Sequence, residues 1–252
     1  MITVKAFLKD RVKFMSTQKN VFALILAGGK GTRMGNAEKP KQFIEIHSKP
    51  IIIYTVEKFM LYNDFQKIIV LAPKQWLKTT EGIIEKYFPN NDKITVACGG
   101  ASRNETMMNG IKYIEDNFTV DEDTVIVTHD AVRPFVTHRI IKENIEFAKQ
   151  YDACDTVVPA TDTLVRSDDG ELISDIPDRS KMYQGQTPQS FKALKLKNHY
   201  LSLTEQEKEI LTDSCKIMLL KGEKVHLVQG EVFNIKITYP FDIKMANAIL
   251  ED

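Results

Sequence analysis

The sequence predicts an α/β protein with a Rossmann-like, mostly parallel sheet, helices on both faces of the sheet, and a protruding β-arm. From residue 21 onward, short apolar runs alternate with amphipathic segments of helical length. Such alternation is typical of parallel strands joined by crossover helices. It breaks between residues 161 and 186, where two segments of alternating polarity flank the turn sequence Ser-Asp-Asp-Gly. We therefore expect an N-terminal extension (residues 1–20) and one domain (residues 21–252), with the arm at about 161–186.

The elements follow in order from the run VFALILA, which we expect to be a buried strand at residues 21–27. The next strands are expected at 67–72, 93–98, 123–135 (a strand running into a loop) and 154–160. Helices are expected at 51–62, 75–88, 102–118 and 138–151, with Ser102 as an N-cap. After the arm we expect a helical region at 192–220, strands at 224–229 and 233–238, and a helix at 240–250. Ligands of parallel sheets bind at the carboxyl ends of strands, which directs attention to residues 27–41, 99–106 and 129–135.

Composition argues against several classes of protein. The 252 residues include 34 basic and 34 acidic side chains, so a general nucleic-acid or membrane-surface binder is not expected. No apolar run approaches the roughly 18 residues of a membrane span, and residues 1–20 lack the apolar stretch of a signal peptide. The three cysteines are far apart and form no disulfide framework, so we expect a reducing, cytoplasmic setting.

The segment LILAGGKGTRMG, residues 24–35, raises the first question about function. It does not match the Walker loop, and the spacing from Gly29 through Gly31 to Gly35 is one residue too long for the dinucleotide fingerprint. A backbone this poor in side chains still lets successive N–H groups approach phosphate oxygens, to which Arg33 and Lys41 can add cationic donors. The alternative is a tight turn with solvated charges. We favour phosphate binding because glycines and cations occur together after the first strand.

Two further segments place charges in apolar surroundings. In VTHDAVRPF, Asp130 ends a buried strand and is a candidate ligand for Mg²⁺, which takes one or two carboxylates and completes its shell with water and phosphate oxygens. The alternative for Asp130 is a loop cap. We assign His129 no role, and Arg133 either orients the loop or meets a phosphate. In NIKIT, Lys236 interrupts an apolar strand, where it is either an edge charge or a cation aimed at a catalytic anion.

Together these segments resemble the sugar-alcohol-phosphate cytidylyltransferases. The motifs LILAGGKGTRMG, PKQF, GGASRNET, HDAVRPF, DRSKMYQGQTPQSF, TDSCK and NIKIT occur in that family's order, across about residues 21–250. The resemblance implies a nucleotidyltransferase fold that binds CTP. The nucleotide-binding residues it implies are Leu26, Ala27, Gly28, Gly29, Gly31, Arg33, Lys41, Gly99, Gly100, Thr106, Asp130 and Ala131.

The resemblance also implies a reaction in which CTP and a polyol phosphate give a CDP-polyol and pyrophosphate. It makes Arg33, Lys41 and Lys236 catalytic and Asp130 the ligand of a Mg²⁺ cofactor. The acceptor-binding residues it implies are Arg133, Thr163, Arg179, Thr212 and Lys236. Arg179 would reach the neighbouring subunit of a homodimer formed through the β-arm. A projecting hairpin that a monomer cannot bury independently favours such a dimer.

The choice of acceptor depends on finer differences. HDAVRPF, TDSCKI and NIKITYPFDIKMANAIL resemble the ribitol-5-phosphate branch more than the isoprenoid branch. The isoprenoid branch more often has His-Asp-Ala-Ala-Arg-Pro and Pro-Glu-Asp, and Val132 and Phe241 depart from those patterns. We therefore expect D-ribitol 5-phosphate as acceptor, with CDP-ribitol used for teichoic acid of the cell wall or for a capsule precursor. The alternatives are 2-C-methyl-D-erythritol 4-phosphate as acceptor and a non-catalytic nucleotide-binding regulatory module.

Overall fold

The computed structural model describes residues 20–29 and 40–251. Within them, a seven-stranded sheet has the order β5-β4-β1-β6-β8-β7-β9. Its strands are β1 (Val21–Leu26), β4 (Lys67–Ala72), β5 (Ile94–Cys98), β6 (Val125–Asp130), β7 (Ala153–Pro159), β8 (Tyr183–Lys192) and β9 (His226–Gln229). Strand β8 is antiparallel to β6 and β7, and the other neighbouring pairs are parallel. The sheet is therefore mostly parallel, as predicted.

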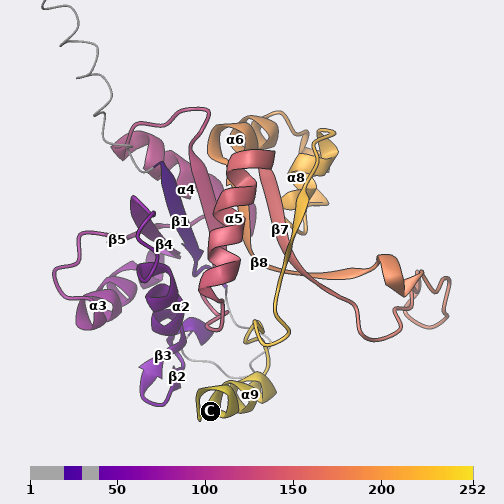
Figure 1. Cartoon of the computed structure of the whole chain (residues 1–252), viewed down its shortest axis with the longest axis horizontal. Helices are drawn as coiled ribbons and strands as arrows, with labels where there is room; N and C mark the ends of the chain where they lie inside the picture. The colour runs from indigo at the N-terminus through magenta and orange to yellow at the C-terminus, as the bar shows by residue number, and fades with distance from the viewer. Residues whose placement is uncertain (1–19, 30–39, 252) are drawn as a thin grey trace, which may run out of the picture.

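Helices cover both faces of this sheet (Figure 1). One face packs against α2 (Ile51–Met60), α3 (Leu77–Tyr87) and α5 (His138–Tyr151), and the other against α4 (Arg103–Asn117), α6 (Ala193–Leu201) and α8 (Cys215–Leu220). The period of two along a strand supplies both cores. In β1, alternate residues face the first core (Val21, Ala23, Ile25) and the second (Phe22, Leu24, Leu26).

Several short elements complete the fold. The 3-10 helices are η3 (Lys41–Phe43), η4 (Lys74–Trp76) and η5 (Arg179–Lys181), and a two-stranded sheet pairs β2 (Glu45–Ile46) with β3 (Lys49–Pro50). Helix α7 (Glu205–Glu209) lies between α6 and α8 in the sequence. The last helix, α9 (Pro240–Glu251), shares a small core with the loop after β6, where Ala246 and Val132 are both buried.

Most of the predicted elements are confirmed. Strand β4 and helix α5 have the predicted bounds, and the side chain of Ser102 caps α4 by accepting a hydrogen bond from the N–H of Glu105 at 3.1 Å. Two expectations are wrong. Residues 233–238 do not form a strand, because the segment runs beside the loop after β6, with Ile237 N–H bonded to Val132 O at 2.9 Å. Lys236 therefore lies on a loop.

The other error concerns β8, a central strand that we did not expect. Its sequence YQGQTPQSFK is polar and contains Pro188, and a proline normally argues against an interior strand. In the structure, the polar side chains of Gln186, Thr187, Gln189 and Ser190 are buried. The predicted arm therefore ends earlier than residue 186, because β8 begins at Tyr183.

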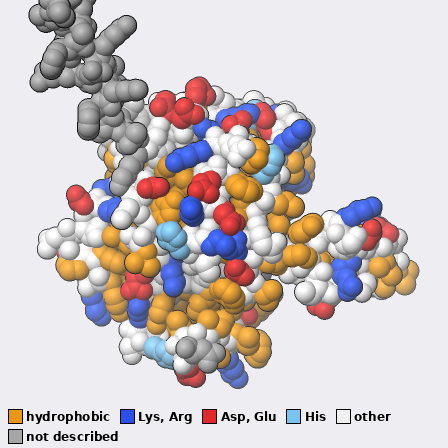
Figure 2. All heavy atoms as spheres, in the orientation of Figure 1, with side chains coloured by type: hydrophobic (Ala, Val, Ile, Leu, Met, Phe, Trp, Pro, Cys, Tyr) orange, Lys and Arg blue, Asp and Glu red, His pale blue; other side chains and the backbone are white. Residues whose placement is uncertain are grey.

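The arm projects from the sheet between β7 and β8 (Figure 1). Within it, the predicted hairpin is reduced to one antiparallel bridge, between Arg166 and Asp175. The turn contains Gly170 with φ +81°, a backbone conformation that favours glycine. Apolar side chains are exposed on the arm, among them Leu172 at 72% and Ile173 at 60%. Figure 2 shows that the surface of the arm carries both apolar and charged groups. A longer ladder is not expected where one chain offers its apolar side chains nothing to pack on.

The predicted extension at residues 1–20 lies, apart from Asn20, outside the described residues. In the part of the chain that is described, no helix is both long and apolar enough to cross a membrane.

Candidate active site

The candidate site is a pocket at the carboxyl ends of β1 and β6. Its walls are the backbone after β1, the first turn of α4, the residues that end β6, and the loop that carries Lys236. The carboxyl ends of neighbouring parallel strands meet at one edge of the sheet, and this edge is where α/β proteins bind ligands. The fold thus brings the three predicted segments together, with residues 30–39 of the first lying outside the described residues.

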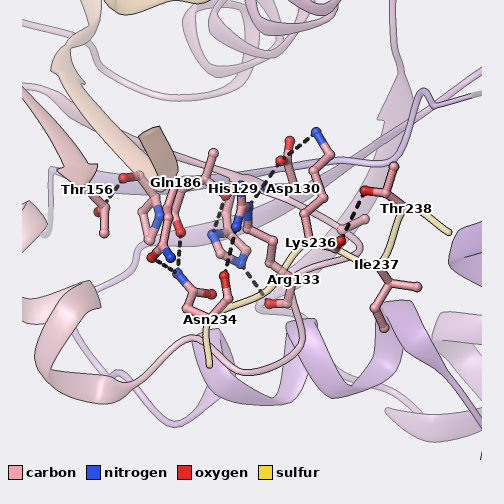
Figure 3. Close-up of polar contacts among 12 residues, drawn as sticks. His129, Asp130, Arg133, Thr156, Gln186, Asn234, Lys236, Ile237 and Thr238 are labelled. Carbon is pink, nitrogen blue, oxygen red and sulfur yellow. Dashed lines mark hydrogen bonds and ion pairs between the residues drawn. The ribbon is translucent and has the colours of Figure 1, made fainter. Parts of the chain in front are cut away.

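Asp130 is the electrostatic centre of this pocket. Its Oδ2 lies 2.9 Å from Lys236 Nζ and 3.5 Å from Arg133 Nε, and its Oδ1 lies 4.0 Å from Arg103 Nε. Figure 3 shows Lys236 reaching Asp130 from the loop opposite. Burial alone would raise the pKa of Asp130, but the charges of Arg103, Lys236 and Arg133 outweigh burial and hold the pKa well below its usual range. Three cations therefore converge on one ionised carboxylate.

His129 fixes the backbone on either side of Asp130. Burial lowers the pKa of His129 to about 4, so the ring is neutral at neutral pH. Because a carbonyl only accepts, Nε2 carries the proton and donates to Arg133 O at 3.0 Å. Nδ1 then accepts from Thr187 Oγ1 at 3.0 Å, and that hydroxyl accepts from the N–H of Asp130 at 3.1 Å. This chain joins β6, β8 and the loop after β6 (Figure 3).

Arg133 ties the same loop to the segment that carries Lys236. Its Nη1 donates to Asn234 O at 2.7 Å, and Asn234 Nδ2 donates to Thr187 O and Gln186 Oε1, both at 3.0 Å. The side chain of Arg133 is only 11% exposed. Of the two roles expected for Arg133, orientation of the loop is the one seen here, and contact with a phosphate stays a prediction.

Lys41 and the glycine loop form the opposite side of the pocket. Lys41 is 6% exposed, and its Nζ donates to Ile237 O at 3.0 Å. The neighbouring Gln42 is also buried, and its Nε2 donates to Ala27 O at 2.7 Å, which holds the start of the glycine loop in place. Leu26, Ala27, Gly28 and Gly29 line the pocket, and their contact with CTP stays a prediction. Gly31 and Arg33 lie outside the described residues.

Close packing against α4 requires the two glycines that precede this helix. A Cβ on Gly100 would lie 2.4 Å from Glu105 Cβ, and a Cβ on Gly99 would lie 3.1 Å from Thr106 Cγ2. Thr106 Oγ1 accepts from Gly100 N–H at 3.0 Å and donates to Ser102 O at 2.7 Å. This packing brings Gly100 and Thr106 to the pocket wall, beside Asp130 and Ala131. Their contact with a nucleotide stays a prediction.

The residues expected to bind the acceptor are not gathered in this pocket. Thr163 and Arg179 are exposed on the arm, which points away from the sheet (Figure 1). Arg179 Nη1 donates to Thr161 O at 2.9 Å, a contact within the arm. Thr212 is exposed just before α8 and does not belong to the pocket wall formed by the described residues. One chain therefore presents only Lys236 and Arg133 of the expected acceptor set close to Asp130.

The donor set can be tested against Mg²⁺. Among the described residues of the pocket wall, Asp130 has the one carboxylate, and cations occupy both of its oxygens at 2.9–4.0 Å. A single carboxylate suits an ion that takes its remaining ligands from water and phosphate. Asp130 therefore fits Mg²⁺ if phosphate oxygens of a nucleotide and water supply the remaining ligands.

The sequence analysis did not identify several residues of the site. Arg103 lines the pocket, Gln42 holds the glycine loop, and Thr187 supports Asp130. All three lie in motifs that the sequence already marks, namely GGASRNET, PKQF and QTPQSF. The signal was present, but which polar side chain in a motif faces the pocket depends on the fold.

Comparison with known proteins places this pocket in context. Residues 21–252 match the family IspD, 2-C-methyl-D-erythritol 4-phosphate cytidylyltransferase. The structure is similar to that of 4-diphosphocytidyl-2C-methyl-D-erythritol synthase from Anaerococcus prevotii, with 28% identity, coverage of 92% of this chain and 96% of that chain, and a TM-score of 0.75. It is also similar to the 2-C-methyl-D-erythritol 4-phosphate cytidylyltransferase of Francisella tularensis, with 26% identity, coverage of 91% and 99%, and a TM-score of 0.75. The enzyme of that name from Thermus thermophilus, at 24% identity, 92% and 99% coverage and a TM-score of 0.71, supports the fold alone.

Proposed function

The chain belongs to the 2-C-methyl-D-erythritol 4-phosphate cytidylyltransferase family and is thus a nucleotidyltransferase, and we propose that its pocket transfers the cytidylyl group of CTP to a small polyol phosphate. The observation that carries this proposal is the convergence of Lys236, Arg133 and Arg103 on Asp130 beside the glycine-lined backbone after β1. A site with this surplus of cations suits a reaction between two phosphate-bearing substrates.

The chemistry needs positioning more than proton transfer. A phosphate oxygen of the acceptor forms a bond to the α-phosphorus of CTP, and the bond from that phosphorus to the bridging β-phosphate oxygen breaks, releasing pyrophosphate. A phosphate monoester is mostly a dianion at neutral pH, so no base has to activate it. Lys41 and Lys236 counter the charge of the transition state, with Arg33 of the glycine loop as a third cation. The neutral His129 supports the backbone rather than the reaction.

We propose Mg²⁺ as the cofactor. Asp130 would hold the ion together with phosphate oxygens of CTP, and the bound ion would neutralise phosphate charge during transfer. Removal of Mg²⁺ with a chelator should abolish turnover, and adding the ion back should restore it.

Two acceptors are supported by different observations. The names of the family and of the similar structures support 2-C-methyl-D-erythritol 4-phosphate, an isoprenoid precursor, better than ribitol 5-phosphate. Ribitol 5-phosphate, and with it a teichoic acid or capsule precursor, is favoured by Val132 and Phe241. Of these, Val132 lies in the pocket wall and is buried, whereas Phe241 is 65% exposed on α9. Of these two residues, only Val132 lies where it can affect the choice of acceptor within one chain.

We propose a homodimer that completes the acceptor half of the site. Arg179 and Thr163 lie on an arm that projects from its own sheet, and the arm carries exposed apolar side chains. A second copy that covered those side chains could receive Arg179 at its own pocket. The regulatory alternative is disfavoured because Lys41, Asp130, Arg179 and Lys236 all retain the charges that turnover needs.

The test is release of pyrophosphate from CTP with Mg²⁺, with the two polyol phosphates compared at equal concentration. We expect release with at least one acceptor and a much lower rate with ATP or GTP. A higher kcat/KM for one acceptor identifies the substrate. No release with either acceptor, from protein that binds CTP, would instead support the regulatory module.

A further inference from the structure

A polar cluster beside the pocket surrounds Arg103, and its other members have no role in the reaction described so far. It joins Arg103 on α4, Gln189 on β8, and Asp213 and Ser214 before α8, with Asp155 on β7. Gln189 is 1% exposed and Ser214 is fully buried, so the cluster is part of the protein interior. Only Arg103 belongs to the pocket wall.

The guanidinium of Arg103 is hydrogen-bonded on the side that faces away from the pocket. Its Nη1 donates to Ser214 Oγ at 2.5 Å, and its Nη2 donates to Gln189 Oε1 at 3.2 Å. Ser214 Oγ can accept from Arg103 because its own hydrogen points to Asn104 Oδ1 at 3.2 Å. On the pocket side, Arg103 Nε lies 4.0 Å from Asp130 Oδ1, which is too far for a hydrogen bond. The contacts to Ser214 and Gln189 use two of the five N–H groups of an arginine.

The carboxylates fix which end of Gln189 faces Arg103. Gln189 Nε2 donates to both oxygens of Asp213, at 2.9 and 2.8 Å, and to Asp155 Oδ1 at 3.0 Å. An ionised carboxylate only accepts, so the amide nitrogen must point toward Asp213 and the amide oxygen toward Arg103. The oxygen is then ready to accept from the guanidinium.

Asp213 contributes more to this arrangement than Asp155 does. Burial, together with the neighbouring charge of Asp213, raises the pKa of Asp155 to about 7, although the N–H of Gln189 opposes this. Asp155 is therefore partly protonated at neutral pH. Asp213 meets the amide with two oxygens and also accepts from the N–H of Cys215 at 2.8 Å, which anchors it to the start of α8.

We propose that Arg103 is a further phosphate-binding residue of this site, and that Gln189 and Asp213 are positioning residues that aim its guanidinium into the pocket. The ligand is a phosphate group, either the α-phosphate of CTP or the phosphate of the acceptor. Arginine suits this task because its planar fork binds phosphate with parallel hydrogen bonds while its other face stays tethered. The inference rests on the proposed function for the identity of that phosphate.

The experiment compares Arg103→Lys with the matched control Arg139→Lys, measuring kcat, both KM values and Tm. Arg139 is also held by several partners, namely Glu143, Glu231 and Gln229 O, but it lies on α5 outside the pocket wall. We expect Arg103→Lys to lower kcat/KM about tenfold to hundredfold while the control stays near wild type. A raised KM for the acceptor identifies its phosphate as the ligand, whereas a lower kcat or a raised KM for CTP identifies the α-phosphate. A value within twofold of wild type for every parameter overturns the proposal for Arg103.

The positioning role of Asp213 is tested by combining a change at Asp213 with the change at Arg103. Asp213→Asn keeps an oxygen for the N–H of Cys215 but can also donate, so it no longer fixes the amide of Gln189. We expect this variant to lower kcat/KM about threefold to tenfold. The same change should have almost no further effect in an Arg103→Lys background, because the two residues act through one guanidinium. Fully additive losses would instead show that Asp213 serves only stability.

Failure of the proposed function can be told apart from failure of this inference. If wild type releases no pyrophosphate with either acceptor, binding is measured by calorimetry with CTP, inorganic pyrophosphate and inorganic phosphate as probes. Weakening of at least one probe by about tenfold in Arg103→Lys supports phosphate binding by Arg103. Unchanged binding of all three overturns it.

Discussion

The pocket and the arm differ in how their charged side chains are held. In the pocket, Asp130 faces three cations within 4.0 Å, and Arg133 and Lys41 each donate to a backbone carbonyl. On the arm, Arg179 is exposed, and its guanidinium donates to a backbone carbonyl of the same arm, Thr161 O. Fixed charges in a buried pocket lose little on binding a substrate, whereas an exposed arginine has to be ordered by its ligand or by a partner. The difference supports our proposal that the nucleotide half of the site is assembled within one chain and that a second copy completes the acceptor half.

Removal of Lys236 should have the largest effect. Lys236→Ala deletes the cation closest to Asp130, and loss of one preorganised electrostatic group costs roughly a hundredfold to a thousandfold in kcat. Its side chain is 38% exposed, so Tm should change little. Steady-state kinetics and thermal unfolding check both statements, with the exposed Lys244→Ala on α9 as control. Near-normal kcat in Lys236→Ala would remove this lysine from the reaction.

Removal of Arg179 should have the next largest effect and should act on the other substrate. Charge-assisted contacts contribute roughly 1.5–3 kcal/mol, so Arg179→Ala should raise the KM for the polyol phosphate about tenfold to hundredfold. The KM for CTP should stay almost unchanged, because the nucleotide half lies in the pocket. Equal changes in both KM values would contradict the division between pocket and arm.

Mixing variants tests whether the site is shared between subunits. Arg179→Ala is combined with Lys41→Ala, and subunit exchange is confirmed. If the arm crosses to the partner, each mixed dimer has one site with both defects and one with neither, so about half of its sites recover. A mixture as inactive as either parent would show that Arg179 does not serve the partner's pocket.

The comparison also shows where sequence reasoning succeeds. Apolar periodicity predicted the parallel strands and their helices, because burial on both faces of a sheet selects continuous apolar runs. It failed at β8, where Gln186, Thr187 and Gln189 are buried but bonded to other polar groups. Such residues look like loop residues until their partners, which lie far away in the sequence, are known. Lys236 was recognised as important, but it lies on a loop rather than in a strand.

The motifs predicted some residues of the site but not others. Asp130, Lys41 and Lys236 all line the pocket, although Asp130 ends β6, Lys41 begins η3 and Lys236 lies on a loop. Arg103 was overlooked because its partners Gln189 and Ser214 are more than 80 residues away in the sequence. Arg179 is the opposite case, since the motif identifies it but it is not among the described residues that form the pocket wall.

Asp155, on the flank of the pocket, should make stability depend on pH in a way that an arm carboxylate does not. Its pKa of about 7 lies above the ordinary value of 3.8, and burial, Asp213, Arg103 and Arg133 all act on it. Between pH 4 and 7 the folded protein holds a proton that the unfolded chain has released, so this group lowers stability as pH rises through that window. Asp155→Asn should therefore be equal to wild type near pH 4 and more stable by about 4 kcal/mol at pH 8, since each of the roughly three units of difference in pKa is worth about 1.4 kcal/mol.

Urea unfolding across this pH range checks the prediction, with Asp162→Asn as control because Asp162 is exposed at the base of the arm. The control should track wild type at every pH. A constant offset between Asp155→Asn and wild type, without the rise from pH 4 to 7, would show that the carboxyl does not titrate there.

The smallest expected effect concerns the apolar side chains of the arm. Leu172 is 72% exposed in one chain, and burial of such a side chain by a second copy would contribute about 1 kcal/mol per arm. A dimer has two arms, so Leu172→Ser should weaken dimerisation by about thirtyfold, measured by sedimentation, and leave unfolding of the isolated chain unchanged. The matched control is Arg166→Ala, also on the arm, whose side chain is 66% exposed and pairs with Asp168 at 2.8 Å. Exposed pairs of this kind contribute less than about 1 kcal/mol and stay within the arm, so the control should dimerise like wild type. If Leu172→Ser also sediments like wild type, the arm does not bury this side chain against a second copy. Arg179 would then have to reach its acceptor without an interface at the tip of the arm.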